Sequence, residues 1–356
     1  MDREDVFDKV QHGEPVRRVD LRHLGFDGAD LKGAVFEGVA FPREMVGALL
    51  KESTFVECDF TGCQLQGADL HLATFYKCRL EGASLARGKL IGASFAECSA
   101  EGASFDEVEG PIATWVKTSL CGASFVRANL DRGNILECPA EGASFQDANL
   151  EKATLYRADL RRADLTGANL TLTTLVEAML GAKSFRTNRL FRTQFMKSEL
   201  AGASFADTDC AQCNFLGADL RGASFELSRA PQCTFGEANM SGARMVDGRF
   251  ENAIFEKVDL AGADLSGASL EEAYFGKAAL VGARLVGARL READFSQADL
   301  TAADFSGASM YRTRLHRTTR VDTVLPKPGL WLGDDEELAA AETWQPKHGA
   351  TAAEAR

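Results

Sequence analysis

Nine cysteines are the residues of this chain with the most readily used chemistry, because a thiolate binds metals and exchanges disulfide bonds. Two of them stand three residues apart in the stretch "CAQC" at 210–213, which is the spacing of a zinc-ligand pair or of a thioredoxin-like redox pair. Three others, Cys58, Cys78 and Cys98, recur at intervals of twenty residues. Whether any of these thiols can react depends on the elements that hold them.

Every fifth residue of the chain is large and apolar. Of the 54 positions taken in steps of five from Leu50 to Leu315, 49 are Leu, Phe, Met, Ile or Trp, and the residue two before each is usually Ala. A period of five matches neither the 3.6-residue turn of a helix nor the two-residue alternation of a strand. The chain must therefore turn a corner every five residues, with these two positions pointing inward.

The same pentapeptides return at multiples of twenty residues. The sequence "EGASF" occupies 101–105 and 141–145, and "AGASF" occupies 201–205. Four five-residue sides close a square coil, and coils stacked about 4.8 Å apart would bring residues twenty apart into contact. The phenylalanines follow this arrangement, since they gather on two opposite sides, one containing Phe55 and the other Phe105, while Leu fills the two sides between.

This frame places the cysteines inside the coil. Only Cys121 is predicted outside, and Cys210 takes a large apolar position. The five histidines are scattered, so we expect no metal site and no cofactor. A nucleophile elbow and a phosphate-binding glycine loop are also missing from the sequence, so enzyme activity is not expected. Seven cysteines take the small inward position, where they would behave as small buried hydrophobes: Cys58, Cys63, Cys78, Cys98, Cys138, Cys213 and Cys233.

Long tandem units of the type A-D/N-L-x-x resemble those of pentapeptide-repeat proteins, and the resemblance covers residues 19–317. It implies an all-β fold, a right-handed quadrilateral parallel β-helix of about 14–15 coils. We expect short helical caps at both ends, because a solenoid must cover its terminal coils. The resemblance indicates almost nothing about function, since the repeated residues are the ones that build the solenoid.

The ends of the repeat divide the chain into five parts. Residues 1–18 are predicted to hold a capping helix over 3–11 and a lead-in, and residues 19–47 a first coil and a break in the frame, where nine residues instead of ten separate Phe41 from Leu50. A bulged corner or short loop is expected at the break. The continuous β-helix would run over 48–317, a C-terminal cap with a short helix over 318–345, and a disordered tail over 346–356.

Four apolar residues near the C-terminus, Leu330, Trp331, Leu332 and Trp344, fall outside the repeat. One interpretation is a cap over the last coil. The other is a dimerisation or partner-docking element.

The overall charge of −12 argues against direct nucleic-acid binding, which needs a cationic surface. No apolar run is long enough to span a membrane, and the first ten residues lack the apolar stretch of a signal peptide. We therefore expect a cytoplasmic protein that contacts neither membrane nor nucleic acid and has no small-molecule substrate.

Function must then lie on the outer faces. Two residues after each large position on the Phe55 side, the charge alternates without error over eight coils, and this charge ladder supports the stacking of coils. One residue after each large position, where side chains should face solvent, the column is apolar for nine coils. We predict that this apolar stripe docks a protein partner or a second copy; the alternative is that the long side chains of the ladder cover it. The ladder is Glu57, Lys77, Glu97, Lys117, Glu137, Arg157, Glu177 and Lys197, and the stripe is Val56, Tyr76, Ala96, Val116, Leu136, Tyr156, Val176, Met196 and Leu216.

An acidic face forms a second candidate surface. Some pentapeptide-repeat proteins are DNA mimics that bind type II topoisomerases such as DNA gyrase and protect them from inhibitors, and the resemblance makes that function the alternative here. DNA carries one negative charge per roughly 1.7 Å along its whole length, so a full-length mimic must be strongly negative throughout. The basic column on another side, which includes Arg229 and Arg249, excludes such mimicry along the whole length. The acidic face consists of Glu81, Glu101, Glu141, Asp159, Glu199, Asp219, Asp259 and Asp299.

The predicted helix, the "GEP" at 13–15 and the first "DL" at 20–21 resemble the opening of pentapeptide modules that accompany accessory proteins of bacterial type VI secretion systems. The sequence thus favours a rigid interaction scaffold, with a secretion-associated adaptor as its most specific version. The partner itself is not encoded in the repeat.

Overall fold

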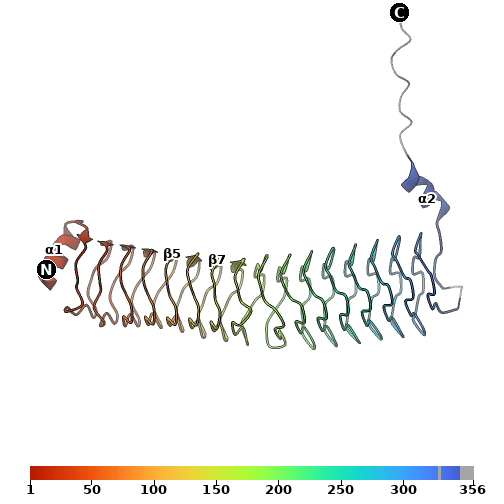
Figure 1. The fold of residues 1–356 in the computed structure, drawn as a ribbon, viewed down its shortest axis with the longest axis horizontal. Helices are drawn as coiled ribbons and strands as arrows, with labels where there is room; N and C mark the ends of the chain where they lie inside the picture. Colours follow the sequence, from red (N-terminus) through yellow and green to blue (C-terminus); the bar gives the residue numbers. More distant parts are fainter. Residues whose placement is uncertain (328–329, 345–356) are drawn as a thin grey trace, which may run out of the picture.

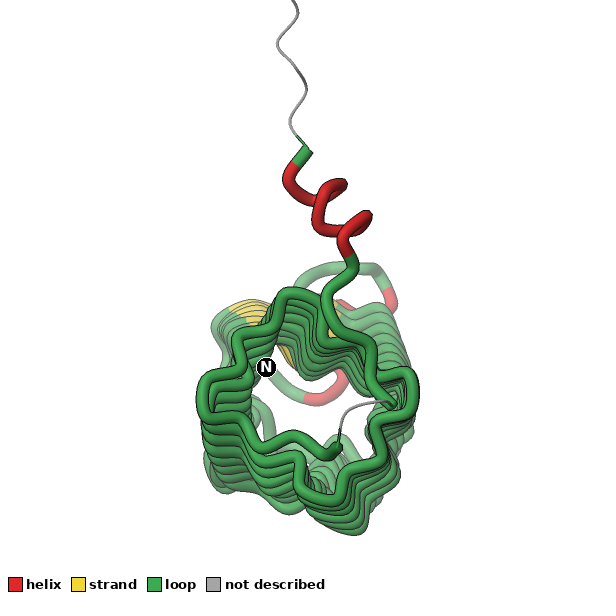
Figure 2. Tube along the Cα trace, turned by 90° about the vertical axis from the view of Figure 1, so that its right-hand side faces the viewer, coloured by secondary structure: helices red, strands yellow, loops and turns green. Residues whose placement is uncertain are grey.

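The chain forms one long four-sided tube. The computed structural model describes residues 1–327 and 330–344; the tail predicted over 346–356 lies outside these residues. Helix α1 (Arg3–Gln11) lies at one end and α2 (Glu336–Thr343) at the other, and the end-on view shows the four sides (Figures 1 and 2). Neither helix is long and apolar enough to cross a membrane among the residues described.

Eight short strands stack in chain order into one parallel sheet on the Phe55 side. Each strand residue from β3 onward pairs with the residue twenty positions later, so the centre of one coil lies directly over the centre of the next. The strands are β1 (Val16–Arg17), β2 (Val35–Glu37), β3 (Thr54–Val56), β4 (Thr74–Tyr76), β5 (Ser94–Ala96), β6 (Thr114–Val116), β7 (Asn134–Leu136) and β8 (Thr154–Tyr156).

Single parallel bridges carry the same stacking along the other sides and beyond β8, as far as the pair Arg314 and Leu332. The prediction of an all-β parallel β-helix is confirmed. Its bounds differ from the predicted ones, because β1 already pairs with β2 from Val16, before residue 19, and the coils continue past 317 to Leu332.

Corners of the tube need a left-handed backbone, which glycine adopts without a steric penalty. Gly102 has a φ of +63° and Gly122 a φ of +66°. The ladder residues also occupy corners, and Lys77 has a φ of +52°. The conformation of the corner therefore comes from the stacking of the coils as well as from glycine.

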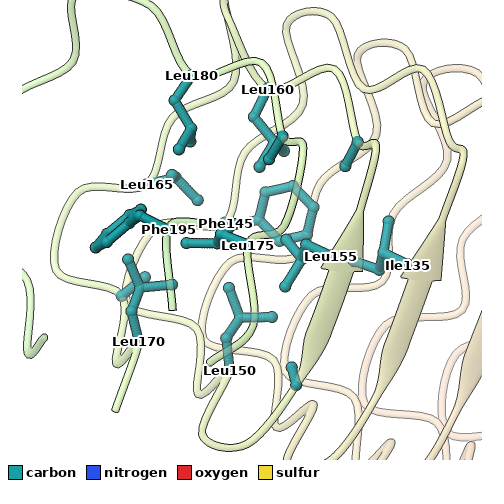
Figure 3. Close-up of a cluster of buried hydrophobic side chains, with 14 of the residues drawn as sticks. Ile135, Phe145, Leu150, Leu155, Leu160, Leu165, Leu170, Leu175, Leu180 and Phe195 are labelled. Carbon is teal, nitrogen blue, oxygen red and sulfur yellow. The ribbon is translucent and has the colours of Figure 1, made fainter. Parts of the chain in front are cut away.

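Aromatic rings stack along two opposite inner walls, as the sequence predicts. The ring centroids of Phe55 and Phe75 lie 4.7 Å apart, and those of Phe105 and Phe125 on the opposite wall lie 4.8 Å apart. Trp115 continues the first stack at 5.5 Å from Phe95. Between the two aromatic segments the core is aliphatic, and Figure 3 shows these leucines converging inside the tube.

The break in the frame is not the bulged corner or loop that the sequence suggested. The side between Phe41 and Met45 is one residue shorter than the others, and Met45 is fully buried at its end. Pairing shifts there from a separation of twenty residues, Asp20 with Ala40, to nineteen, Asp30 with Leu49, and returns to twenty at Glu44 with Gln64. A coil can shorten a side because Met45 reaches the core without a full pentapeptide.

Helix α1 covers the first coil. Asp2 and Asp5 form a reciprocal capping box at its N-terminus, which fixes where it begins. Val6 is fully buried against the core, and the ring of Phe7 packs edge-on against Phe26 at 6.3 Å. The helix thus removes the apolar end of the tube from water.

Helix α2, in contrast, does not cover the last coil. It has no buried residue, and Figure 2 shows it pointing away from the tube. Glu342 holds it to the last coils through Arg317 at 2.8 Å and Gln297 at 2.7 Å. Of the four apolar residues singled out near the C-terminus, Trp331 packs against the core, whereas Leu330, Leu332 and Trp344 are 58%, 47% and 72% exposed. The predicted helical cap is therefore a tethered side arm.

Candidate functional site

The cysteine thiols take part in packing. Eight are buried, and Cys121 is half-buried. An inward thiol donates to a carbonyl of the preceding coil, as Cys213 Sγ does to Leu190 O at 2.7 Å. Burial raises the pKa of Cys63 to about 12 and that of Cys138 to about 11, so neither is a thiolate at neutral pH. No cluster of three His, Cys, Asp or Glu side chains that could hold a metal exists within 1–327 and 330–344.

A hollow of about 660 Å³ lies along the predicted basic column. Arg229, Arg249 and Arg289 line it, together with Glu251 and Glu271. Arg249 pairs with Glu251 at 3.3 Å, and Arg229 pairs with Asp209 at 2.9 Å. The hollow is therefore of mixed charge.

Arginines neutralise much of the predicted acidic face. A bound guanidinium lowers the pKa of Asp159 and of Asp219, each of which pairs with the arginine two residues later. Asp259 and Asp299 instead accept the backbone N–H two residues on, at 3.0 Å each, and so stabilise a turn. The four ion pairs on this face are Glu81 with Arg79 at 3.7 Å, Glu141 with Arg162 at 2.6 Å, Asp159 with Arg161 at 2.7 Å and Asp219 with Arg221 at 2.7 Å.

The apolar stripe lies on the outer surface of the regular sheet. Its members are the last residues of β3 to β8 and the equivalent residues of the next three coils. Tyr76 is 36% and Leu216 is 37% exposed, and the others are half-buried. Beyond Leu216 the column continues with Gly236 and Glu256, so the apolar run ends there. The structure thus brings together all nine predicted residues as one continuous column.

The charge ladder forms the edge of this face. Three of its four carboxylates pair with the preceding cation: Lys77 with Glu97 at 3.8 Å, Lys117 with Glu137 at 3.9 Å and Arg157 with Glu177 at 2.7 Å. Lys77 and Arg157 also lie over the rings of Tyr76 and Tyr156, at 5.0 and 4.9 Å. Ladder side chains therefore cover part of the stripe and leave part of it in contact with water.

The sequence did not predict an interruption around Lys183. This lysine takes an inward position that elsewhere holds a small residue, and its ammonium donates to the carbonyl oxygens of Arg161 and Ala163. Burial lowers its pKa, although Asp164 acts in the opposite direction. Among the residues described, the bridge expected between Asp164 and Ser184 is missing, whereas Ser144 with Asp164 and Ser184 with Ser204 are paired. The ammonium of Lys183 thus takes the place of the Ser184 amide as the donor to Ala163 O.

Lys183→Ala should restore the missing backbone pairing between Asp164 and Ser184. Alanine restores the usual small inward residue, and the amide of Ser184 can then donate to Ala163 O, as Ser104 N does to Ala83 O at 2.9 Å. We expect a gain in local stability of about 1 kcal/mol, the typical value of one such hydrogen bond. Hydrogen exchange at Ser184 measures it, with Lys197→Ala on the outer ladder as the control. Faster exchange at Ser184 in the variant would show that the lysine stabilises the coil.

Comparisons with known proteins concern the repeat. A sequence model of the family described as Pentapeptide repeats matches residues 44–82, 141–178, 198–236, 233–272 and 278–318, with 8 copies. No curated protein matches the chain.

Several solved structures are similar to parts of the chain. Trypsin-treated QnrB1, a plasmid-mediated fluoroquinolone resistance protein, is 23% identical over 45% of this chain and 82% of its own, with a TM-score of 0.33. A pentapeptide repeat protein from the Arabidopsis thaliana thylakoid lumen is 23% identical over 38% of this chain and 82% of its own, with a TM-score of 0.24. HetL, from Nostoc sp. strain PCC 7120, is 23% identical over 79% of this chain and 97% of its own, with a TM-score of 0.19. At these identities the likeness concerns the fold alone.

Proposed function

The chain belongs to the pentapeptide-repeat family, and from that premise we propose that it is a non-enzymatic, rigid scaffold that binds a protein along the flat face of β3 to β8. The observation that carries this proposal is the apolar stripe, which stays in outward positions for nine coils. At a coil spacing of about 4.8 Å it is on the order of 40 Å long. A continuous, partly exposed apolar column of this length is typical of a protein interface.

Single charges placed in the middle of the stripe test the proposal. Leu136→Glu and Tyr156→Glu should abolish association without unfolding the tube, because a buried unpaired carboxylate costs several kcal/mol in an interface but little on a surface. Association is measured as sedimentation of the purified chain and as capture of proteins by the immobilised chain from a cell lysate. Circular dichroism checks the fold.

Leu227→Glu is the matched control. Leu227 is 65% exposed on the opposite wall, so the same charge is added outside the stripe. The proposal requires that association depends on Leu136 and Tyr156 and not on Leu227. Equal sedimentation and equal capture by all three variants and the unchanged chain would overturn it.

The DNA-mimic alternative has less support, because arginines pair with half of the acidic face. It is tested by adding the chain to a DNA gyrase supercoiling assay with and without a quinolone. Inhibition or protection at micromolar concentration would favour the mimic over the scaffold. The secretion-associated version of the scaffold is supported by the opening residues 3–21 alone.

A further inference from the structure

The charge ladder is complementary to a reversed copy of itself. It has eight members, one on each of eight successive coils, and their signs alternate from Glu57 to Lys197. When such a series is turned end to end, the first member faces the last and each acid faces a base. We propose that the protein forms an antiparallel dimer through the face made by β3 to β8 and the next two coils, with the two-fold axis between β6 and β7. This rests on the proposed function and names the docked partner as a second copy.

The ladder pairs of this dimer follow from the register. With the axis between Lys117 and Glu137, these two residues face each other's copies, and every other member faces a residue of opposite sign. A parallel two-fold dimer would instead bring the ladder of each copy over the opposite edge of the other copy's face, so the two ladders would not meet. The predicted pairs between the two copies are Glu57 with Lys197, Lys77 with Glu177, Glu97 with Arg157 and Lys117 with Glu137.

The two ends of the ladder support this register. Glu57 and Lys197 form no ion pair with any other residue in the described part of the chain, whereas the six members between them are joined in three pairs. In the antiparallel dimer each unpaired end faces the unpaired end of the other copy. The dimer would thus gain two ion pairs between the copies, one at each end of the ladder, and these pairs would fix the register.

Eight of the nine members of the apolar stripe fit the same register by size, and the ninth, Leu216, lies one coil beyond the ladder. Ala96, the smallest member of the stripe, faces Tyr156, one of its two largest, and Tyr76 faces Val176. Near the axis Val116 faces Leu136, and at the ends Val56 faces Met196. Large residues opposite small ones allow two surfaces to pack without voids. Charge and volume therefore select the same arrangement, in which residue i contacts j and j contacts i, as in any two-fold interface.

The size of the face predicts a dimer of moderate affinity. Eight coils cover about 35 Å, and one side of the square is roughly 15 Å wide, so each copy would bury on the order of 500 Å². The total of about 1,000 Å² lies at the lower limit of specific interfaces. We expect a dissociation constant in the micromolar range, rising with salt because the rim is charged.

Disulfide crosslinking tests the register directly. In a Cys121→Ser background, the full chain carrying both Val56→Cys and Met196→Cys should form a disulfide-linked dimer under mild oxidation, seen on a non-reducing gel. The two positions are seven coils apart in one chain, about 34 Å, so they cannot join within a molecule. Each single substitution alone should stay monomeric, whereas a mixture of the two single variants should crosslink. Crosslinking of Val56→Cys alone would overturn the antiparallel register.

Sedimentation of the unchanged chain separates this inference from the proposed function. A dimer mass at tens of micromolar, lost in Leu136→Glu and kept in Leu227→Glu, is expected. A monomer at that concentration overturns the dimer. If such a monomer still captures a protein in a manner that depends on Leu136 and Tyr156, the scaffold function stands and only the second copy is excluded as its partner.

Discussion

Trp115→Ala should lower the free energy of unfolding of the surrounding coils by about 3–5 kcal/mol, the range found for removal of a large buried aromatic side chain. Trp115 is fully buried, stacks on Phe95 and contacts Phe105 and Phe125 edge-on at 5.7 and 5.4 Å. It joins the aromatic stacks of two opposite walls, so alanine leaves a cavity that neither wall can fill. Denaturant unfolding followed by circular dichroism measures the loss.

Trp115→Phe is the matched control for ring size. The indole Nε1 is buried and has no hydrogen-bond partner, and an unsatisfied buried donor costs roughly 1–3 kcal/mol. Phenylalanine removes that donor while keeping an aromatic ring on the stack, so its net loss should be less than half of the loss for alanine. If Trp115→Phe lost as much free energy of unfolding as Trp115→Ala, a smaller aromatic ring on the stack would not be enough to hold the two walls together.

Val6→Asp should detach α1 from the tube. Val6 is the fully buried residue of α1, and a carboxylate without a partner at that position costs about 3–5 kcal/mol. Coils of a solenoid interact only with their neighbours, so the damage should stay at this end. The amides of Arg18 and Leu21, which donate to Glu37 O and Ala40 O at 2.8 and 2.9 Å, should lose protection from hydrogen exchange.

Two comparisons check this result. Gln11→Asp adds the same carboxylate at an exposed position of α1 and should leave the Arg18 amide protected. Protection at Phe255, far along the tube, should be unchanged in both variants. Loss of protection at both Arg18 and Phe255 in Val6→Asp would mean that the solenoid unfolds as one cooperative unit.

The fold was predictable because the residue types within each pentapeptide show which of its positions face inward. Phe105 and Ala103 face inward wherever the motif recurs, and no distant contact is needed to decide it. The ladder and the stripe were predictable for the same reason, since a residue's column follows from its number. Cys210 and Cys213 could be assigned to the core on the same basis, in spite of a spacing typical of metal ligands.

The structure departs from the prediction where a single side chain interrupts the five-residue repeat. Met45 ends a side that is one residue short and is still fully buried, and Lys183 reaches carbonyl oxygens that an alanine would leave to the backbone. A helix over the last coil is expected because a solenoid must cover its terminal coils, and α2 does begin after an N-cap, Asp335. Its position depends on polar contacts of Glu342, for which the repeat gives no signal.

The asymmetry between the two ends bears on how the chain assembles during its synthesis. The coil under α1 leaves the ribosome before the coils that follow it in the sequence. It is covered by α1 on one side and open to the next coil on the other. Each later stretch of twenty residues meets a finished backbone edge on which to pair, with only a short loop to close. At about 5–20 residues per second, translation supplies one coil roughly every one to four seconds. Folding can therefore advance coil by coil behind the ribosome, and Lys183, where the template offers one pairing fewer, is the step at which it would pause.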